Sequence, residues 1–286
     1  MCTGYIFHPE NDPVVESIIN DENGYLFLND EATGDFIYAL KRDFGIDEFL
    51  SPPRISFNTA PTNTGLVIFY KGSRRIADNY HFGFKRKWQQ GSRAMYNPGT
   101  NFRFDNLLPN TPGFIAKGLP VNDSKNGNWM YYRAFEKKQF CLIPLRAFVE
   151  FDKESREVQL KTKTTIKEFS VPYLTELRTK QLACVAGLWE YAEDEQQYRF
   201  TFGTTEPNDL VRKFHHDRFP VFLLSKEEQN LWLDPDAPVE EKIRMGLAPA
   251  RSDLFQSWRV SEKINKAQNK GLEVIEKAEG SLIWVA

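Results

Sequence analysis

The sequence predicts an α+β fold, a single domain with a curved mixed or antiparallel β-sheet or barrel-like core flanked by short helices. Its 286 residues are 41% hydrophobic and 14% aromatic, which is enough for one large core. Short apolar runs typical of strands alternate with only a few helical patterns. We expect one domain over residues 2–286, with 239–286 as a C-terminal extension.

Local patterns predict the elements in order. Residues 10–30 are polar and rich in turns, and residues 31–44 place apolar side chains on one helical face. Ser225 and Glu228 form a capping box, which predicts a helix through Leu233. The tail reads as helical and then extended. Strands are predicted at 66–70, 76–84, 140–144, 147–151, 182–191, 198–204 and 221–224, an exposed hairpin at 152–170, and a long functional loop at 91–131.

Charge and cysteine content limit the functional classes. The net charge of −2 lacks the basic excess of a typical nucleic-acid binder, although 71–75, 85–87 and 212–213 are locally basic. A basic groove and scattered solvated lysines are both compatible with that pattern. The three cysteines include no C-x-x-C pair, which argues against a disulfide framework and a zinc site. We expect a cytoplasmic protein without a membrane span, metal or cofactor.

The chain begins Met1-Cys2, and the small side chain of Cys2 favours removal of Met1. The new terminus would carry an α-amine of pKa ~7.7–8.0 beside a thiol of pKa ~8.5, so both react near neutral pH. Such a 1,2-aminothiol attacks an aldehyde through nitrogen and then closes a thiazolidine ring through sulfur. Taken alone, however, Cys2 is more simply an accident of where translation starts.

Further short motifs follow Cys2 along the chain. They are Phe57-Asn58-Thr59-Ala60-Pro61-Thr62, Phe82-Gly83-Phe84-Lys85-Arg86-Lys87-Trp88, Asn101-Phe102-Arg103-Phe104-Asp105, Phe140 to Phe151, Ala186-Gly187-Leu188-Trp189-Glu190 and His216-Asp217-Arg218-Phe219-Pro220. In this order they resemble the motifs of the SRAP family, the SOS response-associated peptidase-like proteins that crosslink to abasic sites in DNA. The resemblance is weakest over 10–50 and the tail. One departure is Thr3-Gly4, where the family usually has Gly-Arg.

The resemblance implies a catalytic set of Cys2, Asn58, Glu150 and His216. An abasic deoxyribose is mostly a closed hemiacetal, so ring opening and loss of water each require a proton transfer, for which glutamate and histidine are suited. The Asn58 amide could hold Cys2 or the sugar by hydrogen bonds. Without the family, Glu150 would read as an outward-facing strand residue; facing inward, it would have a raised pKa. His216 could equally be a polar helix end.

The resemblance also implies DNA contacts. Arg103 can grip a phosphate through two parallel hydrogen bonds. Phe82 and Trp88, beside basic residues, could stack on bases of an unpaired strand, although Trp88 is more simply a core residue. Arg218 could instead form a structural ion pair with Asp217. The remaining expected contacts are Lys85, Arg86, Asn101, Pro61 and Thr62.

These inferences predict a protein that recognises abasic sites in single-stranded DNA. It would form a thiazolidine crosslink through Cys2 by lyase-like Schiff-base chemistry, protecting the lesion in the DNA damage response. We expect a monomer that is nucleoid-associated when bound to DNA. Two alternatives remain open: Cys2 as a peptidase nucleophile that also removes Met1, and a DNA-binding module without crosslinking chemistry.

Overall fold

Five strands close into a barrel at the centre of the molecule. The computed structural model of the chain describes residues 4–9, 18–20, 26–84, 99–107, 129–159, 164–214 and 216–285. The barrel strands are β6 (Thr64–Lys71), β7 (Arg74–Phe82), β13 (Gln197–Thr205), β12 (Ala183–Ala192) and β9 (Phe140–Leu145). Each pairs with the next, and β9 pairs back to β6; only the β7–β13 ladder is parallel. The barrel-like core and the predicted α+β class are thereby confirmed.

Short strands extend the barrel sheet, and a second sheet lies beside it. The extensions are β4 (Glu48–Phe49), β8 (Asn101–Arg103), β14 (Phe219–Pro220) and β15 (Phe222–Leu223). The second sheet has the order β17 (Trp284–Val285), β16 (Phe255–Arg259), β11 (Thr164–Leu177), β10 (Ala147–Gln159), β1 (Gly4–Phe7) and β5 (Ser56–Thr59). Only Arg146 separates β9 from β10, so one segment passes from barrel to second sheet. A buried ion pair of 3.0 Å between Arg146 and Glu176 fixes that passage.

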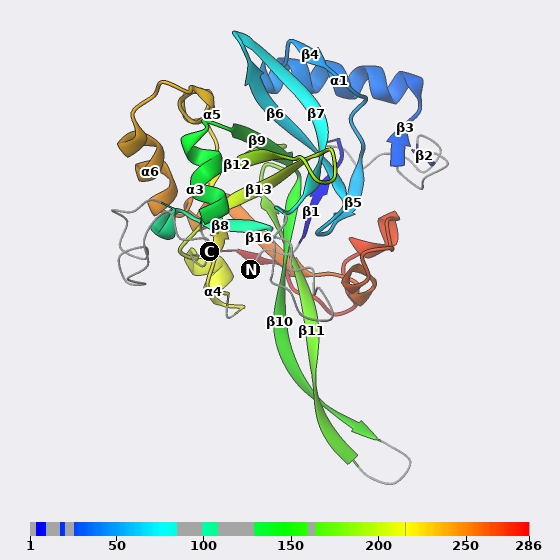
Figure 1. Cartoon of the computed structure of the whole chain (residues 1–286). Helices are drawn as coiled ribbons and strands as arrows, with labels where there is room; N and C mark the ends of the chain where they lie inside the picture. The colour runs from blue at the N-terminus through cyan, green and yellow to red at the C-terminus, as the bar shows by residue number, and fades with distance from the viewer. Residues whose placement is uncertain are drawn as a thin grey trace.

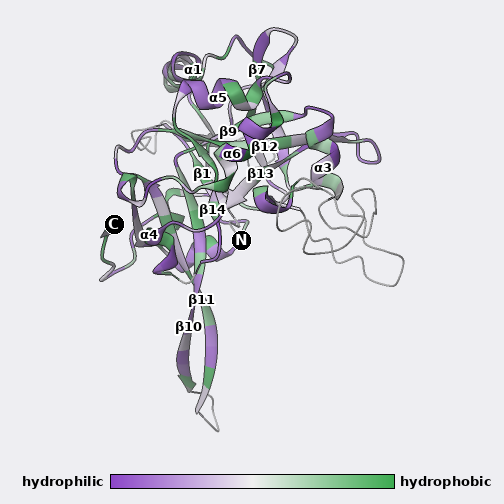
Figure 2. Cartoon of the chain, turned by 90° about the vertical axis from the view of Figure 1, so that its left-hand side faces the viewer, coloured by the Kyte–Doolittle hydropathy of each residue, from purple (hydrophilic) through white to green (hydrophobic). Residues whose placement is uncertain are grey.

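Strands β10 and β11 continue beyond the second sheet as a two-stranded arm that projects from the body in both views (Figures 1 and 2). Their ladder runs from Ala147↔Glu176 to Gln159↔Thr164. The exposed hairpin predicted at 152–170 is therefore confirmed. Its outer part alternates polar and apolar bands (Figure 2), and Ile166 is 70% exposed.

Helices lie around the outside of the molecule, most of them near the barrel and α4 (Asp209–Arg212) against the second sheet (Figure 1). They are α1 (Asp30–Phe44), α3 (Trp129–Glu136), α4, α5 (Lys226–Leu233) and α6 (Val239–Leu247), with 3-10 turns η2 (Phe104–Asn106), η3 (Ser252–Leu254), η4 (Glu262–Asn265) and η5 (Leu272–Val274). The Asn29 side chain caps α1 by accepting from the Ala32 amide, and Gly45, at φ 65°, ends it. The capping box of Ser225 and Glu228 opens α5 as predicted.

Strand β1 is held in place by its own Tyr5, whose ring enters the barrel. Tyr5 is buried and meets Phe82, Phe200 and Phe202 edge-on at centroid distances of 5.7, 6.3 and 6.2 Å. Only glycine fits at Gly65, because a β-carbon there would overlap the Tyr5 hydroxyl. The aromatic core therefore fixes the position of β1.

Two regions differ from the sequence prediction. Within the polar stretch 10–30, β2 (Ile18–Asn20) and β3 (Leu26–Leu28) pair as a small hairpin. Of the predicted loop 91–131, the structure describes 99–107 and 129–131, which form β8, η2 and the start of α3. Among the described helices, none is long and apolar enough to span a membrane.

Candidate active site beside the N-terminal strand

Glu150 lies on β10 with its carboxyl group turned into the protein. The residue is only 2% exposed, and its Oε2 lies 3.5 Å from Nδ1 of His216, in the segment between α4 and β14. Burial raises the pKa of Glu150 to about 8. The carboxyl group is therefore mostly protonated at neutral pH and able to donate a proton. The inward orientation of Glu150 is confirmed, and the outward one is wrong.

The side-chain amide of Asn58, on β5, has a defined orientation. Its nitrogen lies within hydrogen-bond distance of three main-chain oxygens, those of Ile264 (3.1 Å), Lys266 (3.2 Å) and Asn269 (3.2 Å). Only the NH₂ end can donate to carbonyls, so an amide oxygen in that position would be repelled. The amide oxygen lies on the other side, where a β-carbon on Gly4 would be 3.8 Å from it. Asn58 therefore presents an acceptor to the start of β1.

These two parts of the site lie on opposite faces of the second sheet. Val149 and Phe151 line a cavity of about 510 Å³ together with Gly4 and Asn58. Because strand side chains alternate, Glu150 points to the other face, toward His216. Gly4 pairs with Val149, which is next to Glu150 in β10. The start of β1 therefore lies in this sheet beside both Glu150 and Asn58.

Cys2 lies outside the described residues. Cys2 precedes Gly4 by two residues, and even a fully extended chain spans at most about 7 Å between two Cα atoms at that separation.

Arg103 and Arg218 converge on one carboxylate at the end of β8. Arg103, 44% exposed at its side chain, donates to both Asp105 oxygens at 3.1 and 2.7 Å. Arg218 is 4% exposed and donates to the Thr204 carbonyl (2.8 Å) and to Asp105 (3.2 Å). Arg103 is accessible to solvent, whereas Arg218 is almost buried by its contacts. The DNA contacts of both residues stay predictions. The partners of Arg218 include Asp105 rather than the suggested Asp217.

The predicted stacking role of Phe82 is wrong. The ring is fully buried in the barrel, stacked on Phe200 at 5.1 Å and on Phe202 at 5.2 Å, so it has no face for a nucleotide base. The other predicted contacts from this motif, Lys85, Arg86 and Trp88, lie outside the described residues.

The remaining predicted contacts are partly accessible. Asn101 begins β8 and donates to the Thr100 hydroxyl at 3.0 Å. Pro61 lines the same cavity as Asn58. Thr62, at φ 74°, donates its amide to the Phe82 carbonyl at 2.8 Å, which fixes the turn after β5.

Sequence reasoning missed Lys270, which also contacts the Asn58 region. Its ammonium group donates to the Asn58 main-chain oxygen at 3.1 Å and to the Asn63 side-chain oxygen. Burial lowers the pKa of Lys270 to about 8. One lysine in a lysine-rich tail gives no local sign of such a contact. Cys141 and Cys184 are fully buried, in agreement with their predicted packing role.

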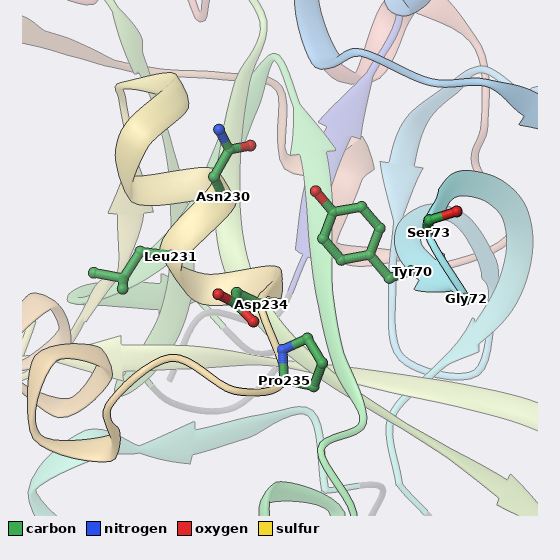
Figure 3. Close-up of a pocket in the computed structure, with 7 residues that line it drawn as sticks. All are labelled: Tyr70, Gly72, Ser73, Asn230, Leu231, Asp234 and Pro235. Atoms are coloured by element: carbon green, nitrogen blue, oxygen red, sulfur yellow. The ribbon is translucent and has the colours of Figure 1, made fainter.

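A second hollow, of about 540 Å³, lies between the β6–β7 turn and the end of α5. Figure 3 shows its lining residues Tyr70, Gly72, Ser73, Asn230, Leu231, Asp234 and Pro235. None of them belongs to the predicted site. Among the described residues, no group of three or more His, Cys, Asp or Glu side chains could hold a metal ion.

The fold is a closed barrel with a buried carboxyl group and an imidazole beside its N-terminal strand. The chain belongs to the SRAP family: the family model "SOS response associated peptidase (SRAP)" matches residues 123–267, about half of the chain. This membership confirms the predicted resemblance.

Two curated relatives support that membership, and one solved structure shares the fold. The chain is 26% identical over 238 residues to abasic site processing protein YoaM of Bacillus subtilis, covering 82% of this chain and 90% of YoaM. It is 24% identical over 229 residues to abasic site processing protein YMR114C of Saccharomyces cerevisiae, covering 78% of this chain and 53% of the yeast protein, so it spans about half of that relative. A crystal structure of a Bordetella bronchiseptica protein aligns with a TM-score of 0.55 over 91% of this chain and 100% of that one; at 18% identity it shows the fold alone.

Proposed function

We propose that the chain recognises abasic sites in single-stranded DNA and joins them covalently to Cys2 as a thiazolidine. The observation on which this proposal depends is the buried Glu150–His216 pair next to the strand that leads to Cys2. A proton donor with a pKa near neutrality is what imine formation at an aldehyde requires. The two relatives named as abasic site processing proteins supply the substrate class.

The chemistry balances with the residues available. The Cys2 amine adds to the open-chain aldehyde of the abasic sugar, and the carbinolamine loses its hydroxyl as water when Glu150 donates a proton, which leaves a protonated imine and a Glu150 carboxylate. The Cys2 sulfur then adds to the imine carbon, the ring nitrogen keeps its proton, and the thiol proton returns to Glu150. His216 acts earlier, moving a proton at the sugar oxygen during ring opening. Asn58 accepts a hydrogen bond from the amine and orients its lone pair.

Intact-mass measurement tests this function directly. The purified chain is mixed with a single strand containing one abasic site, and with the same strand undamaged. We expect a covalent species equal to the chain without Met1 plus the oligonucleotide minus one water, from the abasic strand only. Noncovalent binding without that species would favour the binding-module alternative. A crosslink formed while Met1 is retained would contradict the aminothiol mechanism.

Arg103→Ala is expected to weaken binding to undamaged single strands and make it less dependent on salt. Losing one phosphate contact should reduce the slope of log K against log salt by about 0.7. The measurement is fluorescence anisotropy at several salt concentrations. Arg251→Ala is a matched control, because Arg251 makes the same two-bond contact with a carboxylate two residues later. An unchanged slope for Arg103→Ala, or an equal loss for Arg251→Ala, would place the DNA contact elsewhere.

A further inference from the structure

Residues 261–270, here called the C-terminal strap, cross over the Asn58 side chain. Three strap carbonyls surround the Asn58 amide nitrogen, and each lies more than 200 positions away in the chain. They determine which end of the amide faces the start of β1. Asn269 and Lys270 lie beyond the segment matched by the family model, which ends at residue 267.

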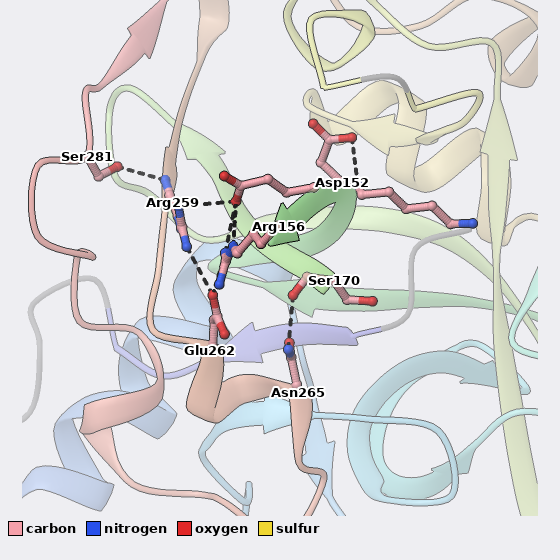
Figure 4. A network of polar contacts seen from close by, with 9 residues as sticks. Asp152, Arg156, Ser170, Arg259, Glu262, Asn265 and Ser281 are labelled. Atoms are coloured by element: carbon pink, nitrogen blue, oxygen red, sulfur yellow. Dashed lines mark hydrogen bonds and ion pairs between the residues drawn. The ribbon is translucent and has the colours of Figure 1, made fainter. Parts of the chain in front are cut away.

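The strap is itself fixed to the second sheet. Glu262 accepts from Arg156 of β10 at 2.8 Å and from Arg259 of β16 at 3.0 Å (Figure 4). The Asn265 side chain donates to the Ser170 carbonyl of β11 at 3.1 Å. Ile264 is buried against the core. The carbonyls around Asn58 are thus held by contacts to three strands.

Lys270 holds the main chain on the other side of Asn58. Its ammonium group bridges the Asn58 carbonyl and the Asn63 side-chain oxygen, and that oxygen also accepts from the Ala60 amide at 3.1 Å. Lys270 therefore ties the strap to both ends of the turn 58–63. A hydrogen bond with a charged donor is roughly twice as strong as a neutral one, so this contact adds substantially to the link between strap and turn.

We propose that the strap is part of the active site and that Lys270 is a positioning residue, acting through Asn58 to keep its amide oxygen toward the start of β1. The role assigned to Asn58 rests on the proposed function. The orientation of its amide is a property of the fold and does not depend on that function. Without Lys270 the turn 58–63 can move away from the strap carbonyls, and the amide can then rotate.

The first test compares Lys270→Met with Lys266→Met. Lys266 is an exposed lysine of the same strap that offers Asn58 only its main-chain oxygen, so it is a matched control. Because small misplacements of reacting groups are costly, Lys270→Met should slow single-turnover crosslinking by about 10-fold or more, and Lys266→Met should not. Both should bind undamaged DNA within about twofold of wild type.

A double-mutant cycle separates positioning from general destabilisation. If Lys270 acts through Asn58, Asn58→Ala with Lys270→Met should be no slower than Asn58→Ala alone. Independent, multiplying losses would overturn the proposal. Asn63→Ala removes the second partner of Lys270 and should reproduce its effect, which keeps the test valid if Lys270→Met does not fold.

A second readout is independent of crosslinking. Hydrogen exchange of the Asn58 side-chain NH₂, followed by NMR, should be slow in wild type and in Lys266→Met and at least about 10-fold faster in Lys270→Met. Equal protection in Lys270→Met would overturn the inference. If the wild-type chain forms no crosslink, the proposed function fails, and the exchange result still decides whether the strap holds Asn58.

Discussion

A Cys2→Ser variant is expected to lose the stable crosslink to abasic DNA entirely while still forming a labile imine. The α-amine remains, so addition to the aldehyde and loss of water can proceed. A serine hydroxyl is a much weaker nucleophile than a thiol at neutral pH, so the ring is not closed. Intact mass should show no covalent species unless borohydride is added to reduce the imine.

Cys141→Ala and Cys184→Ala are the controls for this experiment. Both thiols are fully buried, and burial raises the pKa of each, so neither offers a reactive thiolate. We expect wild-type crosslinking from both. A stable crosslink from Cys2→Ser, or its loss in either control, would show that the chemistry does not depend on the N-terminal thiol.

Local sequence patterns were sufficient for most elements of the fold. The helix over 31–44, the capping box at Ser225 and the hairpin across residues 192–197 all depend on neighbours within a few positions. The sequence predicted a barrel-like core but not which strands close the barrel, because the parallel β7–β13 ladder joins segments more than a hundred residues apart. No local pattern specifies such a pairing.

The errors in the site have the same origin. An aromatic residue near basic ones, such as Phe82, looks the same whether its ring fills a barrel or lines a groove. Strand alternation shows that Glu150 faces opposite to Val149, but it does not show which face is buried. The contacts of Asn58 with the strap span more than 200 positions, so the role of Lys270 became visible only in the fold.

Glu150→Gln is expected to slow crosslinking by about 10²–10⁴-fold, the usual contribution of a general acid. Glutamine preserves the shape of the side chain and its hydrogen-bonding capacity, but it has no acidic proton to give to the departing hydroxyl. Binding to undamaged DNA should be unchanged, because Glu150 is buried.

The pH dependence of stability shows whether this variant tests chemistry or folding. Between pH 4.5, the usual pKa of the group, and about 8, folded Glu150 keeps a proton that the unfolded chain has lost. The folded state therefore binds more protons, and its stability falls as pH rises through this window. Glu150→Gln lacks this penalty, so its Tm should increase relative to wild type as pH rises from 4.5 to 8. A difference in Tm between variant and wild type that stays constant from pH 4.5 to 8 would contradict the buried, protonated carboxyl group.

His216→Ala should also slow crosslinking, at a different step. Histidine is assigned to opening of the sugar ring, and Glu150 to loss of water from the carbinolamine. An oligonucleotide with an open-chain aldehyde needs no ring opening, so it should rescue His216→Ala more than Glu150→Gln. Single-turnover crosslinking of both variants on ring-closed and open-chain strands measures this difference. Equal rescue would overturn the division of roles between the two residues, whose side chains lie 3.5 Å apart. Near wild-type crosslinking rates for both variants on the abasic strand would show that Glu150 and His216 have only a structural role. Cys2 would then react without their help.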